Sequence, residues 1–231
     1  MPNRRFHGKR RFAVFGTFLL IFSSTVAEHY ELTVCCSLHG QGLPFHGEAA
    51  MLDDTYLTGK VSLDSHPFVE HFKFVKALED ENTVAKLTIP APAQFIEQMI
   101  MPFALENTRK YYADNRELAE DIAAGYKKFI ADVYAAGCRN LQFDDCSWGM
   151  LVDPMACMYF GTDEKGLETI KEQLLELNNA AISGKPDDLV INTHVCRGNF
   201  HSTYANSGAY DGVAQTLLAR ENVNAYYLEF D

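Results

Sequence analysis

The sequence predicts an α/β fold, a parallel sheet wrapped by helices, on two observations. From about residue 84 onward, short β-type runs alternate with long helical patterns, which is typical of parallel strands joined by helices. Reactive side chains follow three of the predicted strands, as they do at the carboxyl ends of strands in open sheets and barrels. A complete (β/α)8 barrel usually needs about 250 residues. The 231 residues of this chain therefore predict a partial TIM-type barrel.

The first two strands are predicted at 84–90 and 141–144, with a long helix between them. The earlier strand ends in Pro90-Ala91-Pro92, which makes a rigid turn. Asn115 can cap the helix and Gly137 can end it. Its apolar residues recur three and four positions apart, as one buried helix face requires: they are Leu118, Ile122, Tyr126, Phe129, Ile130 and Val133.

Two further strands are predicted at 189–193 and 223–229. After a loop through Pro154, a helix that ends before Gly184 precedes the first of them, and a short helix over 213–220 precedes the second. The longer helix has one apolar face, made of Leu167, Ile170, Leu174 and Leu177. The chain thus contains at least four β/α steps.

The segment from His66 to His71 invites comparison with metalloprotease helices. The two histidines are five residues apart and fall off a common helical face, so the segment predicts only a helix start with Pro67 in the first turn. No nucleotide-binding glycine fingerprint and no nucleophile elbow is present in the sequence.

Composition predicts one globular domain. Hydrophobic residues make up 47% of the chain and charged residues 22%, which is sufficient for one sizeable core. The net charge of −11 argues against a nucleic-acid partner, which would need clustered Lys and Arg. The six cysteines are scattered, and this favours a reducing, cytoplasmic compartment over a secreted disulfide scaffold.

Residues 1–27 contradict this compartment. Five basic residues precede the apolar run from Phe12 to Phe22, and small residues follow it before Glu28, which is the pattern of a signal peptide. Export would leave 28–231 as the barrel domain. The run is too short for a membrane span of about 20 residues, so no stable membrane insertion is expected. A buried strand of the fold and a foreign N-terminus left by truncation or a wrong start site are the alternatives.

A candidate metal site lies at the end of two consecutive predicted strands. His194 and Cys196 end one strand and share a face of it, and Glu229 ends the next. An imidazole, a thiolate and a carboxylate are the ligand types of catalytic zinc, whereas magnesium and calcium prefer oxygen alone. Taken alone, His-x-Cys is also typical of a strand end with a buried thiol. The location of all three residues at one rim favours the zinc interpretation.

A pair of carboxylates, Asp144 and Asp145, follows the strand at 141–144. They can act as acid/base groups, bind an amino group, or cap the following helix as a solvated turn. At least one of them is expected to point into the rim cavity. Trp148 can stack there on a planar ring, although a single tryptophan is more often part of the core.

Several segments together resemble the cobalamin-independent methionine synthase family, and specifically its short single-barrel branch. The resemblance covers about residues 45 to 231 and implies a barrel of the methionine synthase and uroporphyrinogen decarboxylase type. The segments that carry it are Thr58-Gly59-Lys60, His66-Pro67-Phe68, Thr88-Ile89-Pro90-Ala91-Pro92-Ala93, Leu141-Gln142-Phe143-Asp144-Asp145-Cys146-Ser147-Trp148-Gly149, Thr193-His194-Val195-Cys196-Arg197-Gly198-Asn199 and Tyr227-Leu228-Glu229-Phe230-Asp231.

The resemblance implies zinc-dependent transfer of a methyl group from 5-methyltetrahydrofolate, or a related donor, to homocysteine. His194, Cys196 and Glu229 match three of the family's zinc ligands, and Asp144 matches the carboxylate that holds the amino-acid substrate. Asp145 and Trp148 are further expected substrate contacts. The physical chemistry agrees, because a thiol bound to zinc becomes the nucleophilic thiolate near neutral pH.

The chain also departs from the family. The family's last zinc ligand, a cysteine, and a histidine proposed as its proton donor have no counterpart up to Asp231, and the opening strand has no clear one in residues 1–44. The expectation is therefore a barrel fragment with negligible activity alone and open edges through which it self-associates. A non-catalytic remnant and an exported binding protein are the alternatives.

Overall fold

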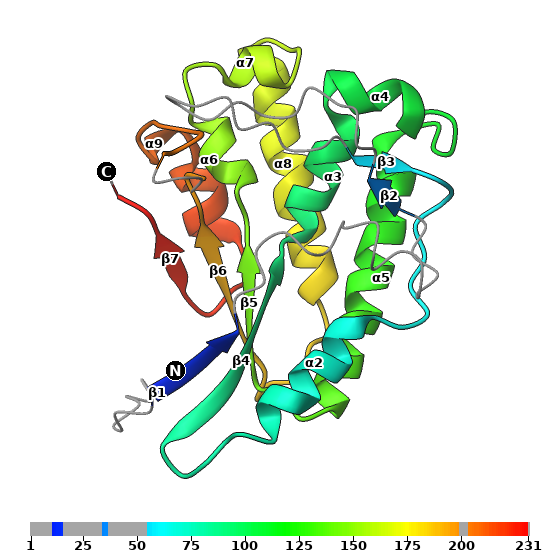
Figure 1. The fold of residues 1–231 in the computed structure, drawn as a ribbon. Helices are drawn as coiled ribbons and strands as arrows, with labels where there is room; N and C mark the ends of the chain where they lie inside the picture. Colours follow the sequence, from blue (N-terminus) through cyan, green and yellow to red (C-terminus); the bar gives the residue numbers. More distant parts are fainter. Residues whose placement is uncertain (1–10, 16–33, 37–54, 199–202, 231) are drawn as a thin grey trace.

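A five-stranded parallel sheet forms the centre of the molecule (Figure 1). The computed structural model describes residues 11–15, 34–36, 55–198 and 203–230. Within them, neighbours in the sheet are also consecutive in the chain, as in part of a (β/α)8 barrel, which confirms the predicted fold class. In sheet order, the strands are β1 (Arg11–Phe15), β4 (Thr83–Pro90), β5 (Asn140–Asp144), β6 (Val190–Val195) and β7 (Tyr226–Leu228).

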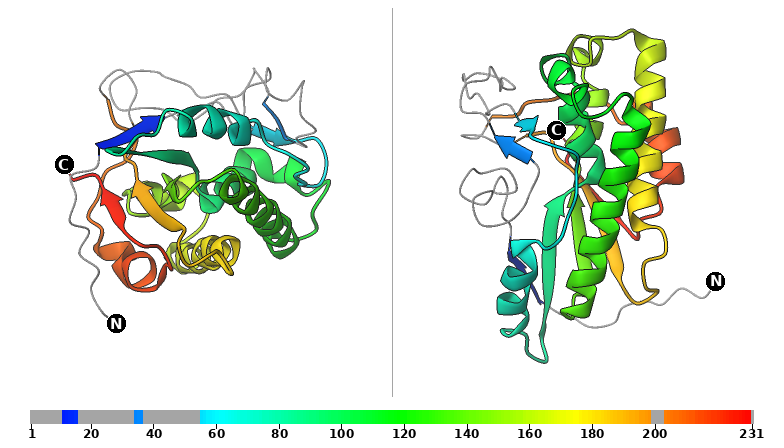
Figure 2. Two further views of the ribbon diagram at one scale, coloured as in Figure 1. Left: turned by 90° about the horizontal axis from the view of Figure 1, so that it is seen from below. Right: turned by 90° about the vertical axis from the view of Figure 1, so that its right-hand side faces the viewer.

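The helices connect the strands and cover one side of the sheet. Figures 1 and 2 show α5 and α8 lying side by side along it, and the two helices are in contact. In chain order, the helices are α2 (Pro67–Lys76), α3 (Pro92–Ile100), α4 (Pro102–Thr108), α5 (Asn115–Ala135), α6 (Ser147–Leu151), α7 (Ala156–Tyr159), α8 (Glu164–Ile182), α9 (Asp211–Val213) and the π-helix η2 (Ala214–Leu218).

The opening strand β1 pairs with β4 from Arg11↔Thr83 to Phe15↔Leu87. This corrects the expectation that residues 1–44 hold no counterpart of the barrel's first strand. It also places the start of the apolar run Phe12–Phe22 in a strand of the sheet, while the rest of the run lies outside the described residues. Two short strands, β2 (Val34–Cys36) and β3 (Thr55–Leu57), form a separate antiparallel pair.

The two faces of the sheet differ in chemistry because side chains alternate along each strand. In β4, Ala85, Leu87 and Ile89 are buried in a core cluster that includes residues of α2 and α5. The residues between them point to the opposite face, which lacks helices among the described elements (Figure 2). Parallel register extends this face across the sheet. Its polar members are Lys86, Thr88, Gln142, Asp144, Asn192 and His194.

Most predicted elements are present, with local corrections. The cap of α5 is Asp114 rather than Asn115, since the Asp114 carboxylate accepts a hydrogen bond from the Glu117 N–H at 3.0 Å. The predicted loop through Pro154 contains α6 and α7. The helix expected over 213–220 is split between α9 and η2, and the last strand begins at Tyr226 rather than 223. None of the helices in the described part is long and apolar enough to cross a membrane.

The helix α6 packs closely against the end of β6. A Cβ atom added at Gly149 would lie 2.6 Å from the backbone oxygen of Cys196, closer than real atoms approach. The glycine therefore lets α6 rest on the segment that carries Cys196, so packing and the candidate site are connected here.

Gly149→Ala is expected to lower the free energy of unfolding by about 1 to 3 kcal/mol, because the added methyl group forces α6 away from Cys196. Gly125→Ala in α5 is the matched control. Its nearest neighbour would be Leu63 Cβ at 3.7 Å, so this alanine is expected to stabilise the helix by roughly 0.5 to 1 kcal/mol. Urea unfolding of both variants checks the prediction, and equal effects would contradict it.

Candidate metal centre

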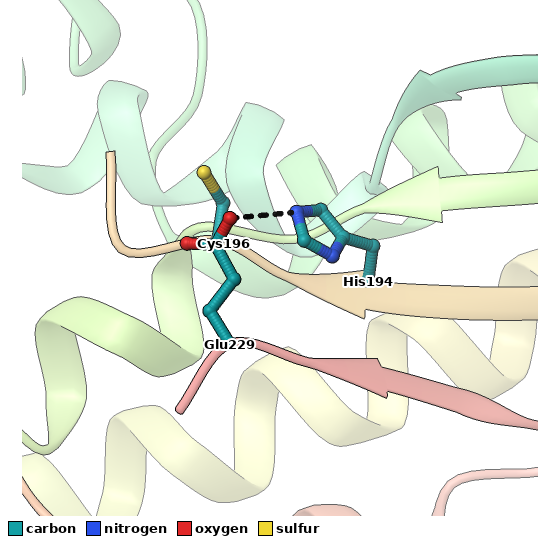
Figure 3. A group of neighbouring side chains, drawn as sticks. All are labelled: His194, Cys196 and Glu229. Carbon is teal, nitrogen blue, oxygen red and sulfur yellow. Dashed lines mark ion pairs between the residues drawn. The ribbon is translucent and has the colours of Figure 1, made fainter. Parts of the chain in front are cut away.

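Three side chains converge at the carboxyl ends of β6 and β7. One ligand atom each from His194, Cys196 and Glu229 lies within 4.8 Å of the others, and His194 Nε2 is 3.8 Å from Glu229 Oε1 (Figure 3). The pairing Val195↔Leu228 brings the next residue of each strand, Cys196 and Glu229, opposite one another. The predicted convergence is thus confirmed.

The imidazole of His194 is oriented by the backbone of β7. Its Nδ1 lies 2.9 Å from the carbonyl oxygen of Tyr227. A carbonyl can only accept, so Nδ1 carries a proton, and Nε2, which faces Glu229, is the ring nitrogen that could bind a metal. Histidines that bind metals usually have this second contact with a carbonyl or carboxylate.

The other two ligand-type residues are also held by backbone donors. The Arg197 N–H donates to Glu229 Oε2 at 2.7 Å, and the Gly198 N–H donates to Cys196 Sγ at 3.2 Å. Gly198 has a φ of 83°, a left-handed conformation that glycine adopts without strain. This turn aims the N–H back at the sulfur and so helps to fix the position of the Cys196 side chain.

Hydrogen bonds lower the pKa of the Cys196 thiol to about 5. The largest contribution is the hydrogen bond that the Cys146 thiol donates, and the His194 and Gly198 contacts add to it against the effect of burial. The pKa of His194 is raised, first by its hydrogen bond with Cys196. The lowered pKa favours the thiolate of Cys196, which is the form that binds metals. From the sequence, Cys146 was expected only as a residue of the neighbouring loop that could complete the metal site, and its hydrogen bond with Cys196 was not predicted.

The donor set fits zinc. One nitrogen, one sulfur and one oxygen already lie within reach of a common point, given zinc bonds of about 2.0 to 2.3 Å. His194 supplies a lone pair, Cys196 a thiolate and Glu229 a carboxylate. Three protein ligands leave at least one position for a substrate, as in catalytic zinc sites.

Asp144 lies on the same face of the sheet as this group. Asp144 of β5 pairs with His194 of β6, so the two side chains point to the same polar face of the sheet. Cys196, two residues after His194, also lies on this face. It is 8% exposed, and its Oδ1 accepts a hydrogen bond from Gln142 Nε2 at 2.7 Å. Burial raises the pKa of Asp144, although Gln142 and His194 oppose this.

Asp145 and Trp148 lie elsewhere. Both are fully buried on the helix side of the sheet, where the Trp148 Nε1–H donates to Asp145 Oδ2 at 2.8 Å. Asn178 of α8 donates to the same oxygen. The expectation that they contact the substrate stays a prediction, and their burial favours a structural role. Alternation explains the difference, since consecutive residues at a strand end point to opposite faces.

Two further buried acids, Glu97 and Glu221, surround Asp145. Asn178 Nδ2 donates to Glu221 Oε1 at 2.7 Å, and the Ser147 hydroxyl contacts Glu97 Oε2 at 3.4 Å. Burial raises the pKa of Glu97 and of Glu221 to about 8, and that of Asp145 to about 6. Glu97 and Glu221 are therefore mostly neutral at pH 7. In the sequence, Glu97 could have been recognised as a buried acid because it is the single acidic residue within the apolar helix α3.

Comparison with known proteins shows what the chain is similar to. No family model matches the chain. It is 36% identical over 191 residues to the uncharacterized protein YxjH of Bacillus subtilis, and 31% identical over 194 residues to YxjG of the same organism. These matches cover 83% of the chain and 49% of each relative, so the chain spans about half the length of the curated relatives it matches.

The structure matches a protein from Listeria monocytogenes assigned as a vitamin-B12-independent methionine synthase. The identity is 36% and the TM-score 0.59, over 77% of this chain and 49% of that one. The chain is thus similar to about half of this Listeria protein in both sequence and fold. A B12-independent methionine synthase from Shewanella, in complex with selenomethionine, shares the fold at 18% identity with a TM-score of 0.54, covering 89% and 53% of the two chains.

Because Glu97 keeps its proton up to about pH 8 in the folded chain but ionises near 4.5 when unfolded, the free energy of unfolding is expected to fall as the pH rises between these values. Glu97→Gln removes the share of this dependence that comes from Glu97 and is expected to stabilise the protein more at pH 8 than at pH 5. The exposed Glu120→Gln is the control. Urea unfolding at both pH values tests this, and a pH-independent effect of Glu97→Gln would contradict it.

Proposed function

We propose that the chain carries the metal and thiol site of a zinc-dependent S-methyltransferase of the methionine synthase type. The reaction would transfer a methyl group from 5-methyltetrahydrofolate, or a related donor, to the thiol of homocysteine. The observation that carries the proposal is the convergence of His194, Cys196 and Glu229, with His194 Nε2 facing the Glu229 carboxylate at 3.8 Å. The relationship to methionine synthases supports the same reaction class.

The residues divide the chemical tasks among them. His194, Cys196 and Glu229 would hold zinc, which would supply the positive charge that keeps the substrate thiol deprotonated. Asp144, one level below Cys196 on the same face, would hold the substrate ammonium group and so orient the sulfur. The transfer forms one S–CH3 bond and breaks the N–CH3 bond of the donor, whose nitrogen keeps the electron pair and takes up a proton.

Substitution of the ligands is expected to weaken metal binding. Cys196→Ser and Glu229→Gln should each lower zinc affinity by roughly tenfold to one hundredfold or more, since even groups outside the ligand shell have effects of this size. Cys157→Ser in α7 is the control cysteine. Competition with a chromogenic chelator measures affinity, and cobalt-loaded protein should show a thiolate charge-transfer band that Cys196→Ser removes. Retention of the band in that variant would contradict the ligand assignment.

The substrate role of Asp144 is tested separately from the metal. Asp144→Asn should weaken homocysteine binding to the zinc-loaded protein by about 10-fold to 150-fold, the loss expected for a charged hydrogen bond. Zinc affinity should remain within a few-fold of wild type. Homoserine, which has a hydroxyl instead of the thiol, is the control ligand and should bind weakly to both proteins. Equal loss of zinc and homocysteine binding would show that Asp144 instead supports the metal site.

A further inference from the structure

A buried lysine lies on the polar face of the sheet. Lys86 of β4 is 9% exposed, and its ammonium group hydrogen-bonds to Gln142 Oε1 of β5. The ammonium also lies 4.7 Å from the centre of the Tyr227 ring, in a cation–π contact. Tyr227 belongs to β7, three strands away from β4 in the sheet, so the contact spans the polar face of the curved sheet.

The contact with Tyr227 shows how far the ammonium group of Lys86 reaches along the strand direction. Asp144, His194 and Tyr227 are register partners and lie at one level of the sheet. Lys86 starts four residues below Pro90, the partner of Asp144 on β4. Its side chain therefore extends toward the carboxyl ends of the strands, and its charge reaches the level at which the candidate substrate site begins.

The charges of Lys86 and Asp144 are separated by one amide. Gln142 accepts from the lysine through Oε1 and donates to Asp144 Oδ1 through Nε2 at 2.7 Å. Among the described residues, no carboxylate is in ion-pair contact with Lys86. Lys86 is 9% exposed and Asp144 is 8% exposed, and neither side chain has an ion-pair partner among the described residues. Each ion therefore lacks the close counter-charge that a buried ion requires.

We propose that Lys86 binds the carboxylate of a zwitterionic α-amino acid whose ammonium group is held by Asp144. An α-amino acid carries the two opposite charges on one carbon atom, so its head group can supply the counter-charge that each side chain lacks. The alternative is a structural role, in which Lys86 only joins β4 to Tyr227. The inference rests on the proposed function for the direction of the ligand, whose sulfur would point to Cys196.

The test uses metal-free protein in EDTA and L-methionine as the probe, with binding measured by calorimetry. Methioninamide lacks the carboxylate, and 4-(methylthio)butanoate lacks the ammonium group. Lys86→Met should weaken methionine binding by about tenfold or more and leave methioninamide binding within twofold of wild type. Lys86→Arg should keep most of the preference for the carboxylate. The control is Lys128→Met, an exposed lysine of α5, which should change nothing.

Equal weakening of methionine and methioninamide binding by Lys86→Met would overturn the proposal in favour of the structural role. Failure of the wild-type protein to prefer methionine over methioninamide would also overturn it. A second measurement needs no variant. Methionine, but not methioninamide, should protect Lys86 from acetylation by acetic anhydride, as read by mass spectrometry.

The outcome is independent of the metal. Methionine has no thiol and the titration contains no zinc. The protein can therefore prefer methionine over methioninamide even if the tests of zinc and homocysteine binding fail. Loss of the preference with intact zinc and homocysteine binding would instead leave the proposed function standing and reject only the role of Lys86.

Discussion

The parallel register of β5, β6 and β7 is the constraint on which the candidate site depends. It places Asp144, His194 and Tyr227 at one level and Cys196 opposite Glu229 at the next. A slip of one residue would turn each of these side chains to the other face of the sheet. The apolar residues between them, such as Val195, are buried against the helices and resist such a slip. The hydrophobic core therefore positions the polar site.

The sheet separates two acidic environments that differ in charge. On the helix side, Glu97 and Glu221 are mostly neutral at pH 7 because burial raises their pKa. On the open side, Glu229 accepts from the Arg197 N–H, and hydrogen bonds, first that of Cys146, lower the pKa of Cys196. Negative charge is thus concentrated where a cation would be bound. The acids behind the sheet contribute hydrogen-bonding groups to the interior without adding a full charge each.

Much of the fold could be predicted from the sequence because the periodic signals are local. The helix from Asn115 to Ala135 and the strands near 84, 141 and 190 follow directly from the spacing of apolar residues. The short helices α6 and α7 could not be predicted, since five and four residues are too few for a recognisable period and tertiary packing, as at Gly149, holds them in place.

The candidate site was predicted in part. His194, Cys196, Glu229 and Asp144 stand at strand ends, where position along the chain indicates the rim. Lys86 and Gln142 were not anticipated, because their importance depends on contacts between different strands. Cys146 was expected only as a residue that could complete the metal site. A charged residue in the middle of the buried strand β4 was the available signal for Lys86. Asp145 and Trp148 were predicted as site residues but are buried on the helix side of the sheet. Residues next to a rim residue in the sequence can point to the other face.

The three candidate ligands also span the outermost pair of described strands. His194 and Cys196 belong to β6, whereas Glu229 follows β7, which pairs with β6 through only three residues. An ion bound by all three side chains would link β6 to β7. Binding of the ion and docking of β7 are then linked equilibria, so each favours the other. Removal of the ion would loosen the edge of the sheet that also carries Tyr227, and with it the orientation of the His194 imidazole.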